Sequence, residues 1–235
     1  MHTQTKNHPD NLPIPPAKLT YFAAGEQHAD LFLSNGELGA ECIRNILKKN
    51  NLDISNFSST LDFGCGCGRI IRHWHNLSHI KLSGVDYNPF LVRWCQANLK
   101  FASFKTNRLY KEIEYKNEEF DFIYAISTFA HLTEFLQYFW LGELKRILKP
   151  DGLLLISAQG TKCIQKLSYE EKKQFKNDQF VIRKAQHAGT NLCWTAYSAN
   201  YTYHMLDWIG LTPVDFVPGG SKDTNQDLFL IKKTN

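Results

Sequence analysis

The sequence predicts an α/β protein with a doubly wound, seven-stranded sheet that is mostly parallel and ends in an antiparallel strand. Three observations favour this class. Five short apolar runs alternate with stretches of helical periodicity, as in a parallel sheet that helices cover on both faces. A glycine-rich turn, residues 64–68, follows the first of these runs. Two later runs, residues 212–217 and 227–232, have no crossover helix between them and so must pair antiparallel.

The first elements lie on either side of the glycine turn. Residues 1–35 begin with a polar, proline-bearing stretch, which predicts a disordered start and then an extended arm near residues 14–21. This arm is expected to act either as a packing strap or as a lid. Residues 37–49 have the apolar spacing of an amphipathic helix. A strand is expected at residues 59–63, and a helix from Gly68 to about residue 76.

The next elements alternate along the chain. Asn88 can cap a helix, and Pro89 suits its first turn. Thr133 can cap a second helix, which Pro150 and Gly152 end. The full series is a strand at 80–86, a helix from 89, strands at 101–106 and 120–126, a helix from 133 to about 148, and a strand at 153–157.

The main domain is expected to cover residues 36–235 and to contain one segment that the minimal sheet does not need. This segment, residues 158–198, includes a predicted helix for which Ser168 and Glu171 form a capping box. Two of its runs, near residues 180–182 and 191–197, can pair as a small hairpin. We expect it to be an insertion on the substrate side, over the carboxyl ends of the strands.

The composition is that of a single soluble domain. The net charge is only +4, with Lys and Arg scattered among acidic residues, so no nucleic-acid partner is expected. The apolar runs are too short to span a membrane, and the polar N-terminus is not a secretory signal. The six cysteines form no Cys-x-x-Cys pair, which favours a reduced, cytoplasmic protein without a metal site. The sequence does not indicate an oligomeric state.

The stretch from Thr60 to Arg72 concentrates residues that can bind a ligand. Glycine has no Cβ and tolerates positive φ, so the turn Gly64-Cys-Gly-Cys-Gly68 lets the backbone approach a ligand closely. The N-terminus of a following helix would suit an anionic group. Asp62 stands two residues before the first glycine, and Asp86 follows at the end of the next strand. A carboxylate at that second position can accept both hydroxyls of a ribose.

These residues resemble the class I S-adenosylmethionine-dependent methyltransferases. Leu61-Asp-Phe-Gly-Cys-Gly-Cys-Gly-Arg69 is similar to the first motif of that family, and Gly84-Val-Asp-Tyr-Asn-Pro89 is similar to the segment that closes its second strand. The Gly-x-Gly-x-Gly spacing differs from the Gly-x-Gly-x-x-Gly fingerprint of dinucleotide-binding proteins. The resemblance implies a Rossmann-like sheet with the reversed last strand of the family, and an enzyme whose cofactor is S-adenosylmethionine.

The resemblance also implies a role for individual residues. Asp62 would brace the turn or reach the cofactor's amino group, Asp86 would accept the ribose hydroxyls, and Tyr87 would flank the adenine. Many family members carry an acidic residue after the third strand to accept a hydrogen bond from adenine; here Asn107 can accept that bond and Arg108 cannot. The implied cofactor-binding residues are Asp62, Gly64, Cys65, Gly66, Asp86, Tyr87, Asn107 and Ile126.

The acceptor of the methyl group is expected to be a small molecule or a sugar-like compound. The segment from Tyr124 to Leu132 resembles the corresponding segment of small-molecule and sugar-directed members. His131 is the candidate general base, because its reference pKa is near neutral; a structural histidine is the alternative. Tyr21, Phe22 and Trp194 are the candidates for the walls of the acceptor site.

Two other functions are compatible with the same sequence. One is a module that binds S-adenosylmethionine without turnover. The other is a nicotinamide-dependent oxidoreductase, which the glycine spacing and the antiparallel tail disfavour.

Overall fold

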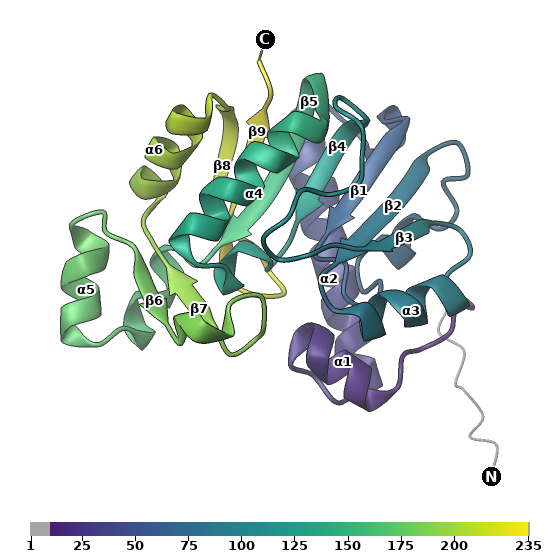
Figure 1. Cartoon of the computed structure of the whole chain (residues 1–235), viewed down its shortest axis with the longest axis horizontal. Coiled ribbons are helices and arrows are strands. Elements are labelled where there is room, and N and C mark those ends of the chain that lie inside the picture. Colours follow the sequence, from purple (N-terminus) through teal and green to yellow (C-terminus); the bar gives the residue numbers. More distant parts are fainter. Residues whose placement is uncertain (1–9, 235) are drawn as a thin grey trace.

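The computed structural model describes residues 10–234 and contains one seven-stranded sheet in the order β3-β2-β1-β4-β5-β9-β8. Strands β1 to β5 are parallel, and β9 runs antiparallel to both of its neighbours (Figure 1). The predicted fold class is therefore confirmed. The strands are β1 Ser59–Phe63, β2 Lys81–Asp86, β3 Ser103–Thr106, β4 Phe120–Ala125, β5 Leu148–Ala158, β8 Thr212–Ser221 and β9 Gln226–Lys232.

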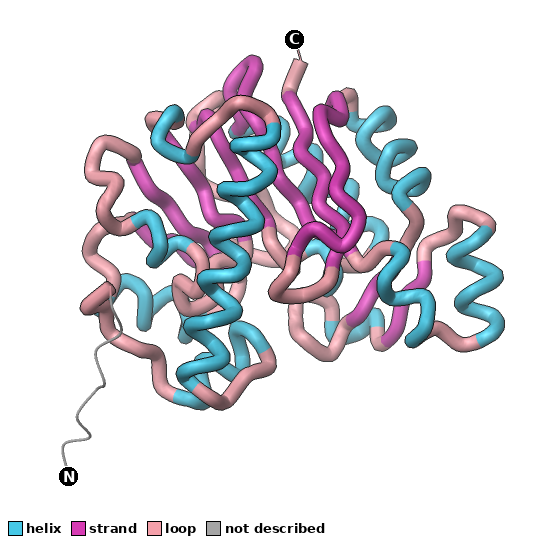
Figure 2. The backbone as a smooth tube through the Cα atoms, turned by 180° about the vertical axis from the view of Figure 1, so that it is seen from behind, coloured by secondary structure: helices cyan, strands magenta, loops and turns pink. Residues whose placement is uncertain are grey.

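Helices cover both faces of this sheet. Helix α2, Ala29–Lys49, crosses one face and is in front when the molecule is viewed from behind (Figure 2), and α3, Pro89–Asn98, lies on the same side. Helices α4, Glu134–Ile147, and α6, Ala199–Ile209, cover the other face. Alternate residues of β4 face the two layers: Phe122 packs in the cluster of α2, and Ile123 packs in the cluster of α4. This double burial explains the continuous apolar run of the strand.

The N-terminal arm is anchored by a buried arginine. The guanidinium of Arg72 is fully buried and pairs with Asp10, with an Nε–Oδ2 distance of 2.6 Å, and it also donates to the carbonyl oxygen of Leu12. Helix α1, Ala17–Ala24, follows directly after Pro16. The extended arm predicted for residues 14–21 therefore ends at Pro16, because a proline just before a helix leaves the next residues free to enter it. The disordered start falls on residues 1–9, which lie outside the described part of the chain.

Helix α2 begins eight residues before its predicted start, because two of its glycines serve packing. A Cβ at Gly36 would lie 2.4 Å from the carbonyl oxygen of Arg69, and a Cβ at Gly39 would lie 3.0 Å from Ile70. The helix thus crosses the segment after the glycine turn at a distance that only glycine permits. In the sequence alone, Asn35 and Gly36 have the composition of a turn.

Replacing Gly36 by alanine is expected to lower the free energy of unfolding by about 2 kcal/mol, because the new methyl group meets rigid backbone. The matched control is Gly142→Ala in α4, where a Cβ meets nothing within 4 Å. There the better helix propensity of alanine is expected to add about 0.5–1 kcal/mol. Chemical denaturation of both variants measures the difference; equal changes of the same sign would contradict the packing argument.

The helix predicted from Gly68 to residue 76 is wrong. The chain turns through residues 66–70 and then forms only the short 3-10 helix η2, Ile71–Trp74. The β-branched residues Ile70 and Ile71 and the aromatic His73 and Trp74 are weak helix formers. The N–H groups of His73 and His75 bond to carbonyl oxygens three residues back instead of four. The glycine turn consequently has no α-helix N-terminus to offer an anion.

The segment between β5 and α6 forms a small lobe beside the carboxyl ends of the strands (Figure 1). It contains η4, Thr161–Lys166, α5, Tyr169–Lys176, and an antiparallel hairpin of β6, Val181–Arg183, and β7, Trp194–Ala196. The capping box of Ser168 and Glu171 at the start of α5 is present as predicted. Within residues 10–234, no helix combines the length and the apolar character that crossing a membrane requires.

Candidate functional site

Two adjoining cavities lie at the carboxyl ends of the parallel strands. The larger has a volume of about 640 Å³ and the smaller about 250 Å³. Their positions follow the rule that open α/β sheets bind ligands outside the carboxyl ends of the strands. The residues that line both cavities, and so form the wall between them, are Ala23, Gly25, Gly64, Ser127, Thr128, His131 and Asn191.

The glycine turn after β1 is closely approached by other parts of the chain. Gly64 and Gly66 have φ angles of 80° and 55°, in the left-handed region that favours glycine. A Cβ at Gly64 would lie 2.3 Å from the hydroxyl oxygen of Thr128, and a Cβ at Gly66 would lie 2.9 Å from the methyl group of Ala23 in α1. The turn therefore needs glycine for its own backbone and for these neighbours, in addition to any ligand.

Asp62 is the buried acid of the smaller cavity. It lines that cavity, and its Oδ2 atom has no hydrogen-bond partner within the described residues. Burial raises the pKa of Asp62 to about 7, although the hydroxyl of Tyr124 and the charge of Arg69 lower it. An unpaired carboxylate oxygen in a buried position is a strong acceptor for a cationic donor such as an ammonium group.

The smaller cavity also contains a positive charge that the sequence reasoning missed. Arg69 lines it, pairs with Asp223 at 2.9 Å and donates to the carbonyl oxygen of Asn35. Asp223 comes from the turn between β8 and β9, so no local pattern connects it with the glycine turn. Ile126 and Cys65 complete the lining near the turn. A hydrogen bond with Cys95, and then burial, raise the pKa of the Cys65 thiol well above its usual value, so this thiol stays protonated.

Asp86 is the acid of the larger cavity. It ends β2, is 9% exposed, and lines the cavity. Its Oδ2 accepts the Gly66 N–H at 2.9 Å and its Oδ1 accepts the Asn88 N–H at 2.8 Å. Burial raises its pKa to about 6, against the effect of these two bonds. Since a carboxylate has about four acceptor positions, two of them remain for hydroxyl donors.

The far end of the larger cavity lies beyond β2 and β3. Tyr87 and Asn107 line it, as does Leu109. Asn107 is buried and its N–H donates to the carbonyl oxygen of Asp86, which orders the ends of these two strands relative to each other. Arg108 is exposed and does not line the cavity. Of the two residues that could occupy the adenine edge, the structure thus brings only Asn107 to the cavity.

His131 lies in the wall between the cavities, and a hydrogen bond fixes the tautomer of its ring. Its Nδ1 is 2.7 Å from the carbonyl oxygen of Cys193, which can only accept, so Nδ1 carries the proton. Burial lowers the pKa of His131, more than the bond to Cys193 raises it. The neutral ring therefore keeps a free lone pair on Nε2, as a general base requires.

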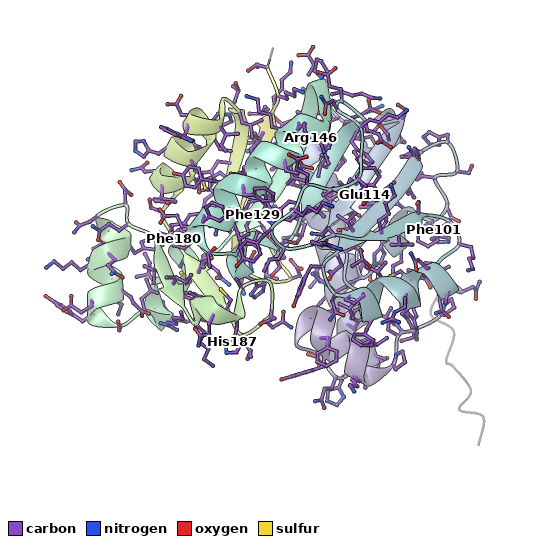
Figure 3. All side chains as sticks on the ribbon, in the orientation of Figure 1. Phe101, Glu114, Phe129, Arg146, Phe180 and His187 are labelled. Atoms are coloured by element: carbon purple, nitrogen blue, oxygen red, sulfur yellow. The ribbon has the colours of Figure 1, made fainter. Side chains whose placement is uncertain are left out.

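Two segments that are distant in the sequence cover the larger cavity. Tyr21 and Phe22 of α1 line it from one side, and residues 187–192 line it from the other. Asn191 joins the two, because its Nδ2 lies 3.2 Å from the carbonyl oxygens of both Tyr21 and Phe22. His187, on this second segment, is labelled at the lower edge of the small lobe in Figure 3, and sequence reasoning did not single it out.

Trp194 was predicted as a wall of the same space, and this prediction needs correction. Trp194 lines neither cavity. Its ring stacks on the guanidinium of Arg183 at 4.7 Å and packs in the core of the small lobe. The cavity is lined instead by Leu192, which precedes β7. Within residues 10–234, no group of three or more His, Cys, Asp or Glu is placed to hold a metal ion.

Residues 61–156 match a family model described as a methyltransferase domain. The fold is similar to that of an S-adenosylmethionine-dependent methyltransferase from Methanosarcina mazei, with a TM-score of 0.57 and 17% identity over 75% of this chain and 92% of the other. It is also similar to a Burkholderia thailandensis 1,6-didemethyltoxoflavin-N1-methyltransferase solved with 1,6-didemethyltoxoflavin and S-adenosylhomocysteine (TM-score 0.59, 18% identity, 84% and 79% of the two chains). Human N-acetylserotonin methyltransferase matches with a TM-score of 0.58 and 15% identity over 86% of this chain and 52% of the other.

Proposed function

Since residues 61–156 form a methyltransferase domain of the class I S-adenosylmethionine-dependent family, we propose that this enzyme methylates a small molecule held in the larger of its two cavities. The observation that carries the proposal is the pair of buried acids on the two sides of one wall. Asp62 has an unpaired oxygen in the smaller cavity, and Asp86 has spare acceptor positions in the larger one. A ligand with an amino group at one end and a ribose in its middle satisfies both.

The residues of the smaller cavity suit the amino-acid end of S-adenosylmethionine. Asp62, Arg69 and Asp223 line this space, and the ion pair of Arg69 with Asp223 leaves Asp62 as the carboxylate without a cationic partner. The ammonium group would bind Asp62, and the ligand's carboxylate would lie toward Arg69, which it would share with Asp223. Asp86 would accept the ribose hydroxyls, while Tyr87 and Asn107 would contact the adenine. Cys65, Gly64, Gly66 and Ile126 would shape the wall around the cofactor without reacting.

S-adenosylmethionine, when bound, would supply a methyl group on a sulfonium for transfer to the acceptor atom, with the neutral thioether as the leaving group. His131 would take the proton that the acceptor atom loses, through the lone pair that its Nδ1 bond leaves on Nε2. The cover formed by α1 and residues 187–192 would exclude water and hold the acceptor against the wall. This covered space, rather than an open groove, favours a small acceptor over a macromolecular one.

Calorimetric titration with S-adenosylhomocysteine tests the cofactor site, and its pH dependence is a specific expectation. Between pH 8 and pH 5.5 the carboxyls of Asp62 and Asp86 gain protons, because their pKa values are raised to about 7 and about 6. The ligand's donors bind the ionised forms, so affinity is expected to weaken by about tenfold or more over this range, with proton release near pH 6.5. Affinity that does not change with pH would contradict the proposed roles of both acids.

The other candidate functions make different predictions in the same experiments. A binding module would bind S-adenosylhomocysteine but methylate no member of a broad acceptor panel. The methyltransferase-domain match disfavours a nicotinamide-dependent oxidoreductase. Preferential binding of a nicotinamide cofactor would be needed to revive that alternative.

A further inference from the structure

Ser127 occupies an unusual position in the wall between the cavities. It lies two residues after the end of β4, lines both cavities, and has a φ angle of 60°, in the left-handed region that serine seldom adopts. Such a conformation persists only where surrounding contacts impose it, and it is frequent at sites that bind or react.

A closed ring of three hydrogen bonds imposes this conformation. The Ser127 N–H donates to Oγ of Ser157 at 2.6 Å, the Ser157 hydroxyl donates to Oε1 of Gln226 at 2.6 Å, and Nε2 of Gln226 donates to Oγ of Ser127 at 3.0 Å. Ser157 and Gln226 are 0% and 1% exposed. The reverse orientation of the Gln226 amide would leave the buried Ser157 proton without an acceptor, so the direction of every bond in the ring is determined.

The ring leaves the Ser127 hydroxyl as a donor. Its oxygen already accepts from Gln226, and within residues 10–234 the hydroxyl donates no hydrogen bond of its own. The same wall also carries a hydrogen-bond acceptor. His131 donates through Nδ1 to the carbonyl oxygen of Cys193 and keeps a lone pair on Nε2. Ser127 and His131 both line the two cavities, so this wall carries one donor and one acceptor, and a hydrogen bond holds each side chain in place.

We propose that Ser127 is a specificity-determining residue and that Ser157 and Gln226 are its positioning residues. Together with His131, Ser127 selects an acceptor whose nucleophilic N–H or O–H stands directly beside a carbonyl oxygen or another lone pair. Lactams and the corresponding edges of nitrogen heterocycles have this arrangement. The N–H faces His131 and the carbonyl oxygen accepts from Ser127. This inference rests on the proposed function, since it describes the acceptor of that same reaction.

Binding of matched probes to the enzyme saturated with S-adenosylhomocysteine tests the inference without turnover. The probes are the lactams oxindole and carbostyril, their N-methyl derivatives, which lack the N–H, and indole, which lacks the carbonyl. The wild-type enzyme is expected to bind the lactams about fivefold or more tightly than either kind of analogue, as the loss of one hydrogen bond implies. Calorimetry measures all of these affinities.

Variants of the enzyme test recognition of the carbonyl oxygen by Ser127 separately from recognition of the N–H group by His131. Ser127→Ala is expected to abolish the preference for oxindole over indole but to retain the preference over N-methyloxindole. Gln226→Met, which removes the amide and keeps the volume, is expected to reduce the first preference severalfold, and provides a second test if Ser127→Ala does not fold. Ser34→Ala in α2 is the control, because Ser34 is an exposed serine that lines neither cavity. It should retain both preferences.

Three outcomes overturn the inference while S-adenosylhomocysteine still binds. They are an absence of lactam binding, equal binding of all probes by the wild-type enzyme, and a full carbonyl preference in Ser127→Ala. Failure of S-adenosylhomocysteine itself to bind would instead contradict the proposed function.

Discussion

Asp62→Asn is expected to weaken the binding of S-adenosylhomocysteine by a factor of about 100 or more and, at the same time, to stabilise the free protein at pH 8. The first effect follows because the amide cannot pair with an ammonium group in a buried site, where the loss of one charged partner costs about 3–5 kcal/mol. The second follows because the wild-type protein must keep a buried carboxylate with an unpaired oxygen.

The sign of the stability effect follows from the pKa of Asp62. The folded-state value of about 7 lies above the ordinary value of 3.8, so the folded state binds the proton more tightly than the unfolded state does. The contribution of Asp62 to the free energy of unfolding therefore falls as the pH rises from about 4 to about 7. The total fall is on the order of 4 kcal/mol once the carboxyl group is charged. We expect Asp62→Asn to recover about 2 kcal/mol of this at pH 8 and none at pH 4, in denaturation experiments without ligand.

Asp121→Asn is the matched control for this prediction. Asp121 lies near the start of β4, at the opposite edge of the sheet from the cavities. Its pKa is lowered although burial opposes this, because Lys149, Ser58 and Ser59 donate hydrogen bonds to it. This variant should lose stability at pH 8 and bind S-adenosylhomocysteine normally. If Asp62→Asn behaved in the same way, Asp62 would have no role in cofactor binding.

His131→Gln is expected to lower kcat by a factor of about 100 to 10,000, the range for removal of a general base, while S-adenosylhomocysteine binds as before. Glutamine can still donate to the carbonyl oxygen of Cys193, but it cannot accept a proton at neutral pH. The measurement is methyl transfer to any acceptor that the wild-type enzyme uses, recorded as a pH profile.

The profile distinguishes a base from a purely structural residue. Because burial lowers the pKa of His131, wild-type kcat should rise with pH to a plateau that is reached below the pH at which an exposed histidine would reach it. The variant should lack this rise. His187→Gln is the control, since His187 lines the same cavity but is exposed; it should change KM at most. An unchanged kcat in His131→Gln would mean that the acceptor loses its proton without a side-chain base.

The elements that local chemistry determines were predictable from the sequence. Strand β1 has its predicted bounds, Asn88 accepts from the N–H of Phe90 at the start of α3, and Thr133 caps α4. The early start of α2 was not predictable, because Gly36 has the composition of a turn and is helical only where another segment packs against it. The short η2 is a second example, in which weak helix propensity prevailed over a motif that usually leads into a helix.

The residues of the site likewise fall into those that local sequence identifies and those that only the tertiary structure brings together. Asp62 and Asp86 could be identified because each follows a recognisable strand at a fixed spacing, and both line the cavities. Asn191, Asp223 and Gln226 could not, because each contributes through a contact with a residue far away in the sequence. Trp194 was misplaced for a related reason: its ring packs against Arg183 and the core of the small lobe, and the sequence around it does not indicate these contacts.

The ring around Ser127 has a consequence for the order in which the site matures during synthesis. Gln226 is made 99 residues after Ser127, and Asn191 is made 170 residues after Tyr21. Asp62, Arg69 and Asp86 are all translated long before either of these late contacts exists. Arg69 likewise meets its partner Asp223 only after the turn between β8 and β9 has been made. Both cavities are therefore completed late, when this turn and strand β9 have left the ribosome and joined the sheet.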